Sequence, residues 1–204
     1  MLPSPDQTVL LRGCLLPEAA GLDAWVDWCG RTSNPSKLFE DSQTGLKGLL
    51  PLVRKGIEGT GFDCDKVLLT YARAAYLHEE RRYKAYSDLC TQILTGLNEA
   101  QIPVVALKAC VVAETAYPEP ADRHCHAVDL LVNKSDLIRA GAVIEGADFT
   151  LNEAQLRPGP HHISYRHRHG LPLELHTRLL ALPDYDLDPE DIWRRSEPGL
   201  IAGV

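Results

Sequence analysis

The fold is decided by residues 102–133, which read IPVVALKACVVAETAYPEPADRHCHAVDLLVN. The short, β-branched run at 102–107 is typical of a buried strand, and the run at 128–133 predicts a second one. Between them, residues 109–118 are apolar, short and ended by a proline, which predicts a helix. The polar residues that follow predict a loop.

Towards the C-terminus the same alternation continues. Residues 134–147 predict an amphipathic helix that ends near Gly146. The later elements are strands at 148–151, 161–167 and 171–179, with a hairpin across 168–172, and a short helix at 188–195 capped by Asp188. Alternating helices and strands over a compact stretch imply a mixed β-sheet covered by helices, so the predicted fold class is α+β.

Towards the N-terminus, residues 1–98 predict a helical region. A short helix is expected at 22–31, and glycines and a proline break the stretch at 33–56 into helix and turn. We therefore expect an N-terminal helical region over residues 1–98 and an α/β core over residues 99–204, which together form one compact unit.

The end of the helical region predicts one long helix, or two in line, over residues 66–98. Asp63 or Asp65 is its expected cap. One apolar stripe with helical spacing comprises Tyr86, Cys90, Ile93 and Leu97. The charged run at 79–82 lies amid polar residues and is expected to be solvated.

The composition is that of a soluble globular protein. The 204 residues are 45% hydrophobic and 24% charged, which suffices for one substantial core. No apolar run approaches the roughly 20 residues of a membrane helix, and the N-terminus lacks a secretory signal pattern. We therefore expect a cytoplasmic protein that binds no membrane. The formal net charge of −7 disfavours a broad nucleic-acid surface.

The cysteines and histidines do not predict a metal site. The six cysteines are scattered without a C-x-x-C pair, at positions 14, 29, 64, 90, 110 and 125. This spacing disfavours a disulfide framework in a cytosolic chain, and also a cysteine-based zinc site. His124 and His126, like His167 and His169, are spaced to share a face of an extended segment. Without cysteines at ligand spacing, surface imidazoles or anion contacts are the favoured interpretation.

Carboxylates on neighbouring strands are the candidate catalytic groups. Two carboxylates that are two residues apart on a strand share a face, and with a third on a neighbouring strand they hold divalent ions for phosphoryl transfer. The candidate stretch is 123–132, with Asp129, and its expected partner strand is 173–176, with Glu174. If the leucines that flank Glu174 face the core, its carboxylate faces the opposite side.

At these residues the chain resembles the uncharacterised nucleotidyltransferase family, which is often found near natural-product gene clusters. Family members show a Leu-Lys-Gly turn, a Tyr-Pro pair, an Arg followed by Asp-Ile-Asp-Leu-Leu-Val, and a later Leu-Glu-Leu-His strand. The similar segments here are IPVVALKACVVAETAYP, DRHCHAVDLLV and LELHTRL, in this order within residues 85–195. The resemblance implies a nucleotidyltransferase-like mixed β-sheet core flanked by helices.

The family's functional positions carry over residue by residue. They fall on Lys108, Tyr117, Arg123, Asp129, Glu174 and His176. Two positions depart from the family, because Ala127 stands where the first aspartate is expected and Ala109 replaces the glycine after the lysine. Alanine cannot bind a cation, so two carboxylates remain where three are expected. The resemblance therefore implies a degenerate Asp-x-Asp motif, and we expect neither a metal nor a cofactor at this site.

Without a metal, the remaining groups divide into two sets. The expected catalytic residues are Asp129, Glu174 and His176. The expected substrate- and anion-binding residues are Lys108, Arg123, His124, His126 and Tyr117. A carboxylate base beside an anion site suits displacement of a sulfate or phosphate by an internal amine or hydroxyl of a small anionic substrate. Ring closure such as aziridine formation in antibiotic biosynthesis is an example.

Two other functions fit the same sequence. One is magnesium-dependent nucleotidyl transfer from ATP to a small molecule or peptide, in which Asp129, Glu174 and a substitute ligand bind Mg²⁺. The other is a non-catalytic subunit that stabilises a catalytic partner, because a fold is often kept after its activity is lost. Nucleotide binding that depends on Mg²⁺ favours the first, and insensitivity to changes at Asp129 and Glu174 favours the second.

The last residues, WRRSEPGLIAGV, include an apolar tail. Members of the resembled family usually continue past this point with a further helical region. We therefore expect a second small protein subunit that completes the fold as a heterodimer, because an uncovered apolar surface lowers solubility. A homodimer through the same surface is the lesser alternative.

Overall fold

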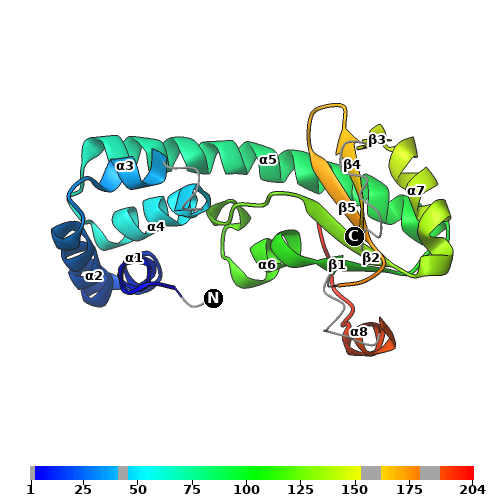
Figure 1. Cartoon of the computed structure of the whole chain (residues 1–204), viewed down its shortest axis with the longest axis horizontal. Helices are drawn as coiled ribbons and strands as arrows, with labels where there is room; N and C mark the ends of the chain where they lie inside the picture. The colour runs from blue at the N-terminus through cyan, green and yellow to red at the C-terminus, as the bar shows by residue number, and fades with distance from the viewer. Residues whose placement is uncertain (1–2, 41–45, 153–161, 180–188) are drawn as a thin grey trace. The chain divides into compact units, whose positions relative to one another are not determined.

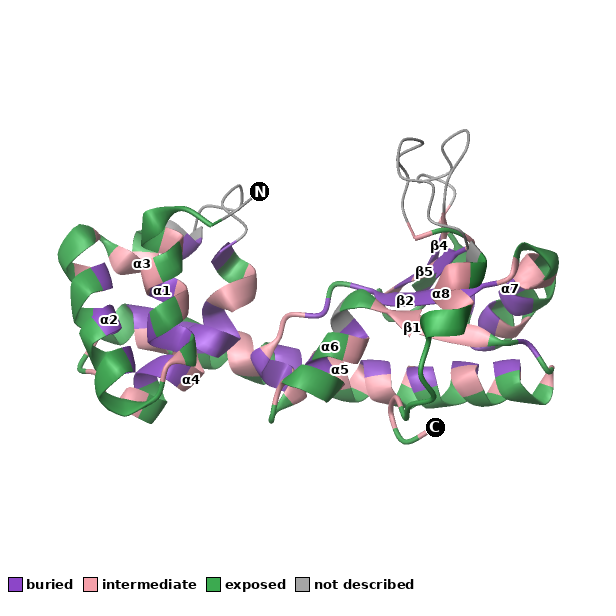
Figure 2. Ribbon diagram, turned by 90° about the horizontal axis from the view of Figure 1, so that it is seen from below, coloured by how far each residue is buried: buried purple, intermediate pink, exposed green. Residues whose placement is uncertain are grey.

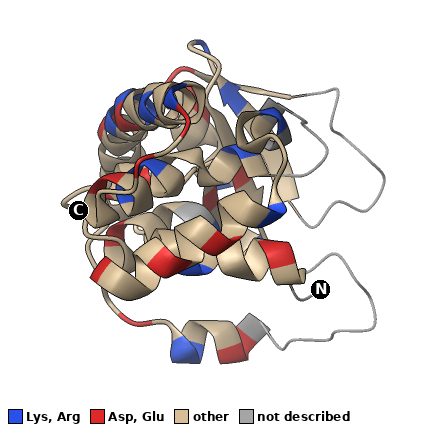
Figure 3. Cartoon of the chain, turned by 90° about the vertical axis from the view of Figure 1, so that its left-hand side faces the viewer, with Lys and Arg blue, Asp and Glu red and all other residues tan. Residues whose placement is uncertain are grey.

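The computed structural model describes residues 3–40, 46–152, 162–179 and 189–204. Within these ranges the chain forms eight α-helices and a five-stranded mixed sheet, which confirms the predicted α+β class (Figure 1). None of the described helices is long and apolar enough to cross a membrane. On the side drawn in Figure 3, lysines and arginines are interspersed with aspartates and glutamates.

By their contacts the residues form two compact units. The first unit comprises Met1–Arg82 and Tyr117–His124, and the second comprises Tyr83–Ala116 and Cys125–Val204. The predicted boundary between residues 98 and 99 lies where the helical region gives way to the α/β core, and it was not based on contacts between residues. It stays a prediction.

The described part of the first unit is helical. Its elements are α1 (Pro5–Leu15), α2 (Glu18–Arg31), α3 (Pro35–Glu40), the 3₁₀ turn η2 (Leu46–Leu49), α4 (Leu50–Thr60) and the 3₁₀ turn η3 (Pro120–Asp122). This confirms the expected helix at 22–31 and the broken stretch at 33–56. Helix α1 begins with a capping box, because the Ser4 hydroxyl accepts from the Gln7 backbone N–H while the Gln7 side chain accepts from the Ser4 N–H. The core centres on Trp25 and Trp28, whose rings meet edge-on at 5.8 Å.

The long helix α5 (Lys66–Glu99) has residues in both units. Asp65 caps it, because its carboxylate accepts from the Val67 backbone N–H at 2.9 Å, which confirms one of the two predicted caps. The predicted apolar stripe is confirmed, since its residues are all buried in one core cluster, namely Tyr86, Cys90, Ile93 and Leu97.

The prediction that residues 79–82 are solvated is wrong for Glu79. This residue is 6% exposed, and His124 Nδ1 lies 2.7 Å from its Oε1. A buried carboxylate needs such a partner, because its charge is costly to remove from water unpaired. Pattern reasoning could not foresee the pair, since 45 residues separate its members.

The second unit is built on the sheet. Its strands are β1 (Val104–Leu107), β2 (Val128–Val132), β3 (Phe149–Leu151), β4 (His162–His167) and β5 (Pro172–His176), in the order β1-β2-β5-β4-β3. Strands β2 and β5 pair in parallel, and the other neighbours pair antiparallel. The predicted hairpin is confirmed between β4 and β5, while His161 lies outside the described residues.

Three helices and a turn accompany the sheet. They are α6 (Lys108–Ala116), the 3₁₀ turn η4 (Lys134–Asp136), α7 (Leu137–Gly146) and α8 (Pro189–Arg195). The predicted helix end at Gly146 is confirmed. The predicted cap of α8, Asp188, lies outside the described residues.

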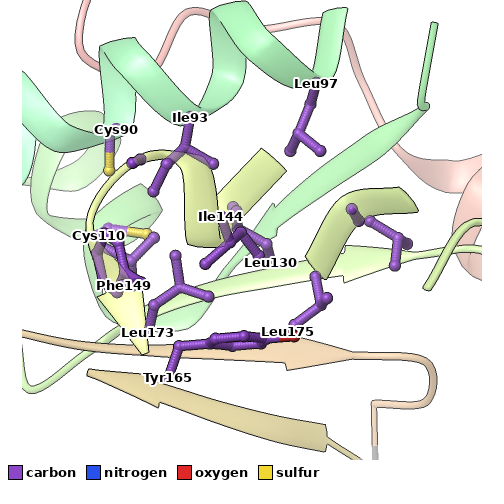
Figure 4. Close-up of a cluster of buried hydrophobic side chains, with 14 of the residues drawn as sticks. Cys90, Ile93, Leu97, Cys110, Leu130, Ile144, Phe149, Tyr165, Leu173 and Leu175 are labelled. Carbon is purple, nitrogen blue, oxygen red and sulfur yellow. The ribbon is translucent and has the colours of Figure 1, made fainter. Parts of the chain in front are cut away.

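The sheet has an apolar face and a polar face. The apolar face packs against α5 and α7 (Figure 4), and its core includes Ile93, Leu130, Ile144, Leu173 and Leu175. Successive side chains of a strand point to opposite faces, so Asp129 and Glu174 lie on the other face. The expectation that Glu174 faces away from the leucines beside it is thereby confirmed. Strand β2 is buried along its whole length, which places Asp129 in a desolvated strand (Figure 2).

Candidate functional site

Strand pairing in the second unit gathers residues that are far apart in the sequence. Because β2 and β5 are parallel neighbours, Asp129 lies opposite Glu174, and His176 follows two residues along the same face of β5. On the other side of β2, strand β1 places Leu107 opposite Asp129, and Lys108 comes next at the start of α6. We call Lys108, Asp129, Glu174 and His176 the site cluster.

The side chains of the site cluster are in direct contact. His176 Nε2 lies 2.8 Å from Asp129 Oδ1, and Lys108 Nζ donates to the same oxygen at 2.5 Å. Lys108 Nζ also lies 3.4 Å from Glu174 Oε2 and 3.4 Å from His176 Nε2. The ammonium therefore sits between two carboxylates and an imidazole.

Burial separates the site cluster into an inner and an outer pair. The side chain of His176 is 0% exposed and that of Asp129 is 6% exposed. Glu174 is 26% exposed and Lys108 is 50% exposed. Asp129 and His176 thus form the inner pair, whereas Glu174 and Lys108 are the two groups that a substrate can contact.

Charge partners outweigh burial in setting the pKa values of Asp129 and Lys108. Burial alone would raise the pKa of the Asp129 carboxyl, but hydrogen bonds from His176 and Lys108 and the Lys108 charge hold it below its ordinary value. Burial would lower the pKa of the Lys108 ammonium, but the hydrogen bond and charge of Asp129, with the charge of Glu174, raise it above its ordinary value. At neutral pH, Asp129 is a carboxylate and Lys108 is an ammonium ion.

The backbone at Lys108 is in the left-handed region, with φ at 57°. For a residue with a side chain this conformation costs about 1–2 kcal/mol. Lys108 stands where β1 ends and α6 begins, so the left-handed turn redirects the chain from strand to helix. Such strain persists where the surroundings hold the residue in place, and it is concentrated at functional sites. The contacts of the ammonium supply that restraint.

One protein-family model, described as uncharacterised nucleotidyltransferase, matches residues 45–204, which is more than half of the chain. The chain belongs to this family. No curated protein and no solved structure matches the chain. Membership of the nucleotidyltransferase family confirms the resemblance and suggests an enzyme.

The nucleotidyltransferase family implies a magnesium ion, and the site cluster fits one poorly. Asp129, Glu174 and His176 each offer a ligand atom, and these atoms lie within 4.8 Å of one another. Mg²⁺ prefers oxygen ligands in octahedral geometry, whereas one of these atoms is an imidazole nitrogen. Ala127, two residues before Asp129, has no donor atom. Lys108 Nζ already lies 2.5 Å from Asp129 Oδ1, so a positive charge is present at this carboxylate.

Three predicted anion-binding residues of this nucleotidyltransferase-family chain belong to the first unit, namely Tyr117, Arg123 and His124. His124 is paired with Glu79 there, and the Arg123 guanidinium lies 5.9 Å from the Tyr117 ring centroid. Arg123 Nε is buried and has no hydrogen-bond partner in the part of the chain that the structure describes.

His126, the remaining predicted anion-binding residue, belongs to the second unit and is exposed. Its backbone carbonyl accepts a hydrogen bond from the Tyr86 hydroxyl at 2.7 Å. The site cluster thus unites Lys108 with the three predicted catalytic residues. The anion-binding role of the other four predicted residues stays a prediction.

A buried ion network, which sequence reasoning missed, anchors the residue before Arg123. The Asp122 side chain is 0% exposed, and Arg54 and Lys55 of α4 lie 2.9 Å and 3.1 Å from its two carboxylate oxygens. Arg54 also lies over the Tyr76 ring at 3.8 Å from the centroid. This network holds the η3 turn against α4.

Two residues of β4 on the polar face were also missed. Ser164 lies opposite Glu174 in the strand register, and its buried Oγ has no hydrogen-bond partner among the described residues. The His162 ring lies 5.1 Å from the His176 ring, centroid to centroid. Alternation along the strand shows that Ser164 and His162 share a face. The register that places them beside Glu174 and His176 depends on the hairpin and is not written in either strand alone.

Proposed function

We propose that this nucleotidyltransferase-family chain displaces a sulfate or phosphate group by an amine or hydroxyl of the same small molecule, and that the ring closes without a divalent metal ion. The observation that carries the proposal is the position of the Lys108 ammonium, which lies between Asp129, Glu174 and His176. The site cluster thereby holds a fixed positive charge beside carboxylate bases, and both are needed in such a displacement.

Glu174 is the proposed proton acceptor. The nucleophilic nitrogen or oxygen forms a bond to the carbon that carries the leaving group. The bond from that carbon to oxygen breaks, and sulfate or phosphate departs with the electron pair. The proton of the nucleophile passes to a carboxylate oxygen of Glu174. Asp129 is less suited to this role, because it is more buried and its lowered pKa makes it a weaker base.

Lys108 is the proposed stabiliser of the leaving anion. As Glu174 takes up the proton it loses its charge, and its attraction for the Lys108 ammonium decreases. The net charge around the departing sulfate or phosphate becomes more positive, so the stabilisation of this anion grows towards the transition state. Asp129 and His176 hold the ammonium and the imidazole in fixed positions.

The proposal gives a further contact with the anion to His126, the predicted anion-binding residue that shares the second unit with the site cluster. It also implies a place in natural-product biosynthesis, where small sulfated or phosphorylated amines are intermediates.

Sulfate and phosphate release from a panel of 2-aminoalkyl sulfates and phosphates tests the proposal. Ion chromatography measures the anion, and mass spectrometry detects the ring product. We expect release that persists in EDTA and falls at least about 100-fold in Glu174→Gln, because general-base catalysis contributes that much or more. The control Glu99→Gln changes an exposed glutamate of α5 and should leave turnover unchanged. Full activity of Glu174→Gln would contradict the proposed base.

Magnesium-dependent nucleotidyl transfer from ATP is the second candidate, because family membership and the three grouped ligand atoms favour it. Isothermal titration with ATP, with and without Mg²⁺, separates the two functions. Nucleotide binding that requires Mg²⁺, together with pyrophosphate release, would replace the displacement proposal. Normal pathway output with both Asp129→Asn and Glu174→Gln would instead indicate a non-catalytic subunit.

A further inference from the structure

We infer that the Lys108 ammonium takes the place of a divalent cation in the site cluster, and that removing this ammonium converts Asp129, Glu174 and His176 into a site for a transition-metal dication. The inference deepens the proposed function. It rests on that function in one respect, namely that the reaction needs no metal ion. Its test measures metal binding rather than turnover, so the two can fail separately.

The first support is the position of the ammonium. The three ligand atoms lie within 4.8 Å of one another, as they must to share one ion. Lys108 Nζ lies 2.5 Å from Asp129 Oδ1 and 3.4 Å from both Glu174 Oε2 and His176 Nε2. It therefore approaches the same three residues that a metal would use.

The second support is that the ammonium and a dication exclude each other. A metal ion bound to Asp129 Oδ1 would lie about 2.0–2.2 Å from that oxygen. An ion that the three residues share would have to lie among the same atoms as Lys108 Nζ, which is within 3.4 Å of all three side chains. Two positive charges that compete for the same ligands repel each other, most strongly beside the buried Asp129 and His176. The two carboxylates do not offset both cations fully.

The third support is that Lys108 is held in place. Its left-handed backbone starts α6, and this conformation aims the side chain at the opposing strand β2. Ala127 allows an ammonium to stand in for a dication. A third carboxylate at this position would raise the attraction of the site for a dication above that for an ammonium. With two carboxylates, one ammonium leaves a single net negative charge.

Manganese is the suitable probe. Two carboxylates and one imidazole suit Mn²⁺ better than Mg²⁺, which prefers oxygen ligands alone. The chain also has six cysteines, and a softer ion such as Zn²⁺ prefers sulfur ligands, which would complicate the measurement. The loss of the free Mn²⁺ signal in electron paramagnetic resonance reports binding directly.

The experiment titrates Mn²⁺ into four full-length proteins. They are the unchanged chain, Lys108→Met, Lys108→Arg and the double variant Lys108→Met/Asp129→Asn. We expect Lys108→Met to bind one Mn²⁺ at least tenfold more tightly than the unchanged chain. Lys108→Arg should not gain affinity, because it keeps the positive charge. The double variant should lose the gain, because asparagine at position 129 lacks the negative charge of the carboxylate. Circular dichroism confirms that each variant is folded, and Lys108→Gln replaces Lys108→Met if the latter does not fold.

Two outcomes would overturn the inference. If the unchanged chain binds Mn²⁺ as tightly as Lys108→Met, the ammonium gives way to a metal and the magnesium-dependent alternative gains support. If folded Lys108→Met and Lys108→Gln both fail to bind Mn²⁺, the three ligands do not form a metal site. In the second case the proposed ring closure without a metal ion still stands, and the anion-release assay in EDTA still tests it.

Discussion

Asp129 carries a negative charge inside a buried strand, and its two hydrogen-bond partners hold it there. Replacement by asparagine keeps the shape but removes the charge that Lys108 and His176 contact. We expect Asp129→Asn to lower the free energy of unfolding at neutral pH by about 1–3 kcal/mol, the range for hydrogen bonds to charged groups. Urea unfolding measures this loss. The control Asp148→Asn alters an exposed ion pair with Arg168, and a change below about 1 kcal/mol is expected there.

The loss caused by Asp129→Asn should depend on pH. The pKa of Asp129 is lowered on folding, so its contribution is present above the ordinary aspartate pKa and is lost as pH falls through the lowered value. The pKa of Lys108 is raised, so its contribution is present below the ordinary lysine pKa and is lost as pH rises through the raised value. The difference between the unchanged chain and Asp129→Asn should therefore be largest near neutral pH and shrink towards pH 3. A difference that grows in acid would contradict the assigned ion pair.

At the scale of elements, α7 approaches the sheet so closely that a glycine is required in it. A Cβ added at Gly141 would lie 2.7 Å from the Tyr165 hydroxyl of β4. We expect Gly141→Ala to destabilise the protein by about 1–3 kcal/mol, because overpacking outweighs the gain in helix propensity. Gly30→Ala in α2 is the matched control, since a Cβ there meets nothing within 4 Å. It should stabilise by about 0.5–1 kcal/mol. Thermal unfolding measures both changes, and a Gly141→Ala variant as stable as the unchanged chain would contradict the overpacking.

Helices and strands were predictable from the sequence where residues close together in the chain determine them. Periodicity and capping residues identified α5, the strands at 104–107 and 128–132, and the hairpin of β4 and β5. The placement of carboxylates on predicted strands indicated Asp129 and Glu174, and the resemblance to the nucleotidyltransferase family implied Lys108 and His176. The Glu174 strand was expected to be the partner of the Asp129 strand, but the partnership of Lys108 with these carboxylates was not predicted, and Lys108 was assigned to the anion instead. That partnership depends on the parallel register of β2 and β5, which only tertiary packing fixes.

At the scale of the whole molecule, large apolar side chains are exposed on the second unit. Ile138 is 87% exposed and Leu200 is 73% exposed. Single exposed apolar residues are common in monomers, so these two do not define an interface by themselves. The predicted second subunit is tested by light scattering during size-exclusion chromatography, with the chain purified from its native host. We expect a mass above the 22.5 kDa of one chain. A monodisperse monomer that turns over substrate would contradict the prediction.

The parallel pair at the centre of the sheet has a consequence for folding kinetics. Asp129 is 47 residues from His176, and Lys108 is 68 residues from it. Closing such long loops is slow, and parallel strands cannot form as a local hairpin. The polar groups therefore come together only when β5, with its hairpin partner β4, has paired with β2. During refolding, helix signals should recover before turnover does, and the delay between them times the pairing of β5 with β2.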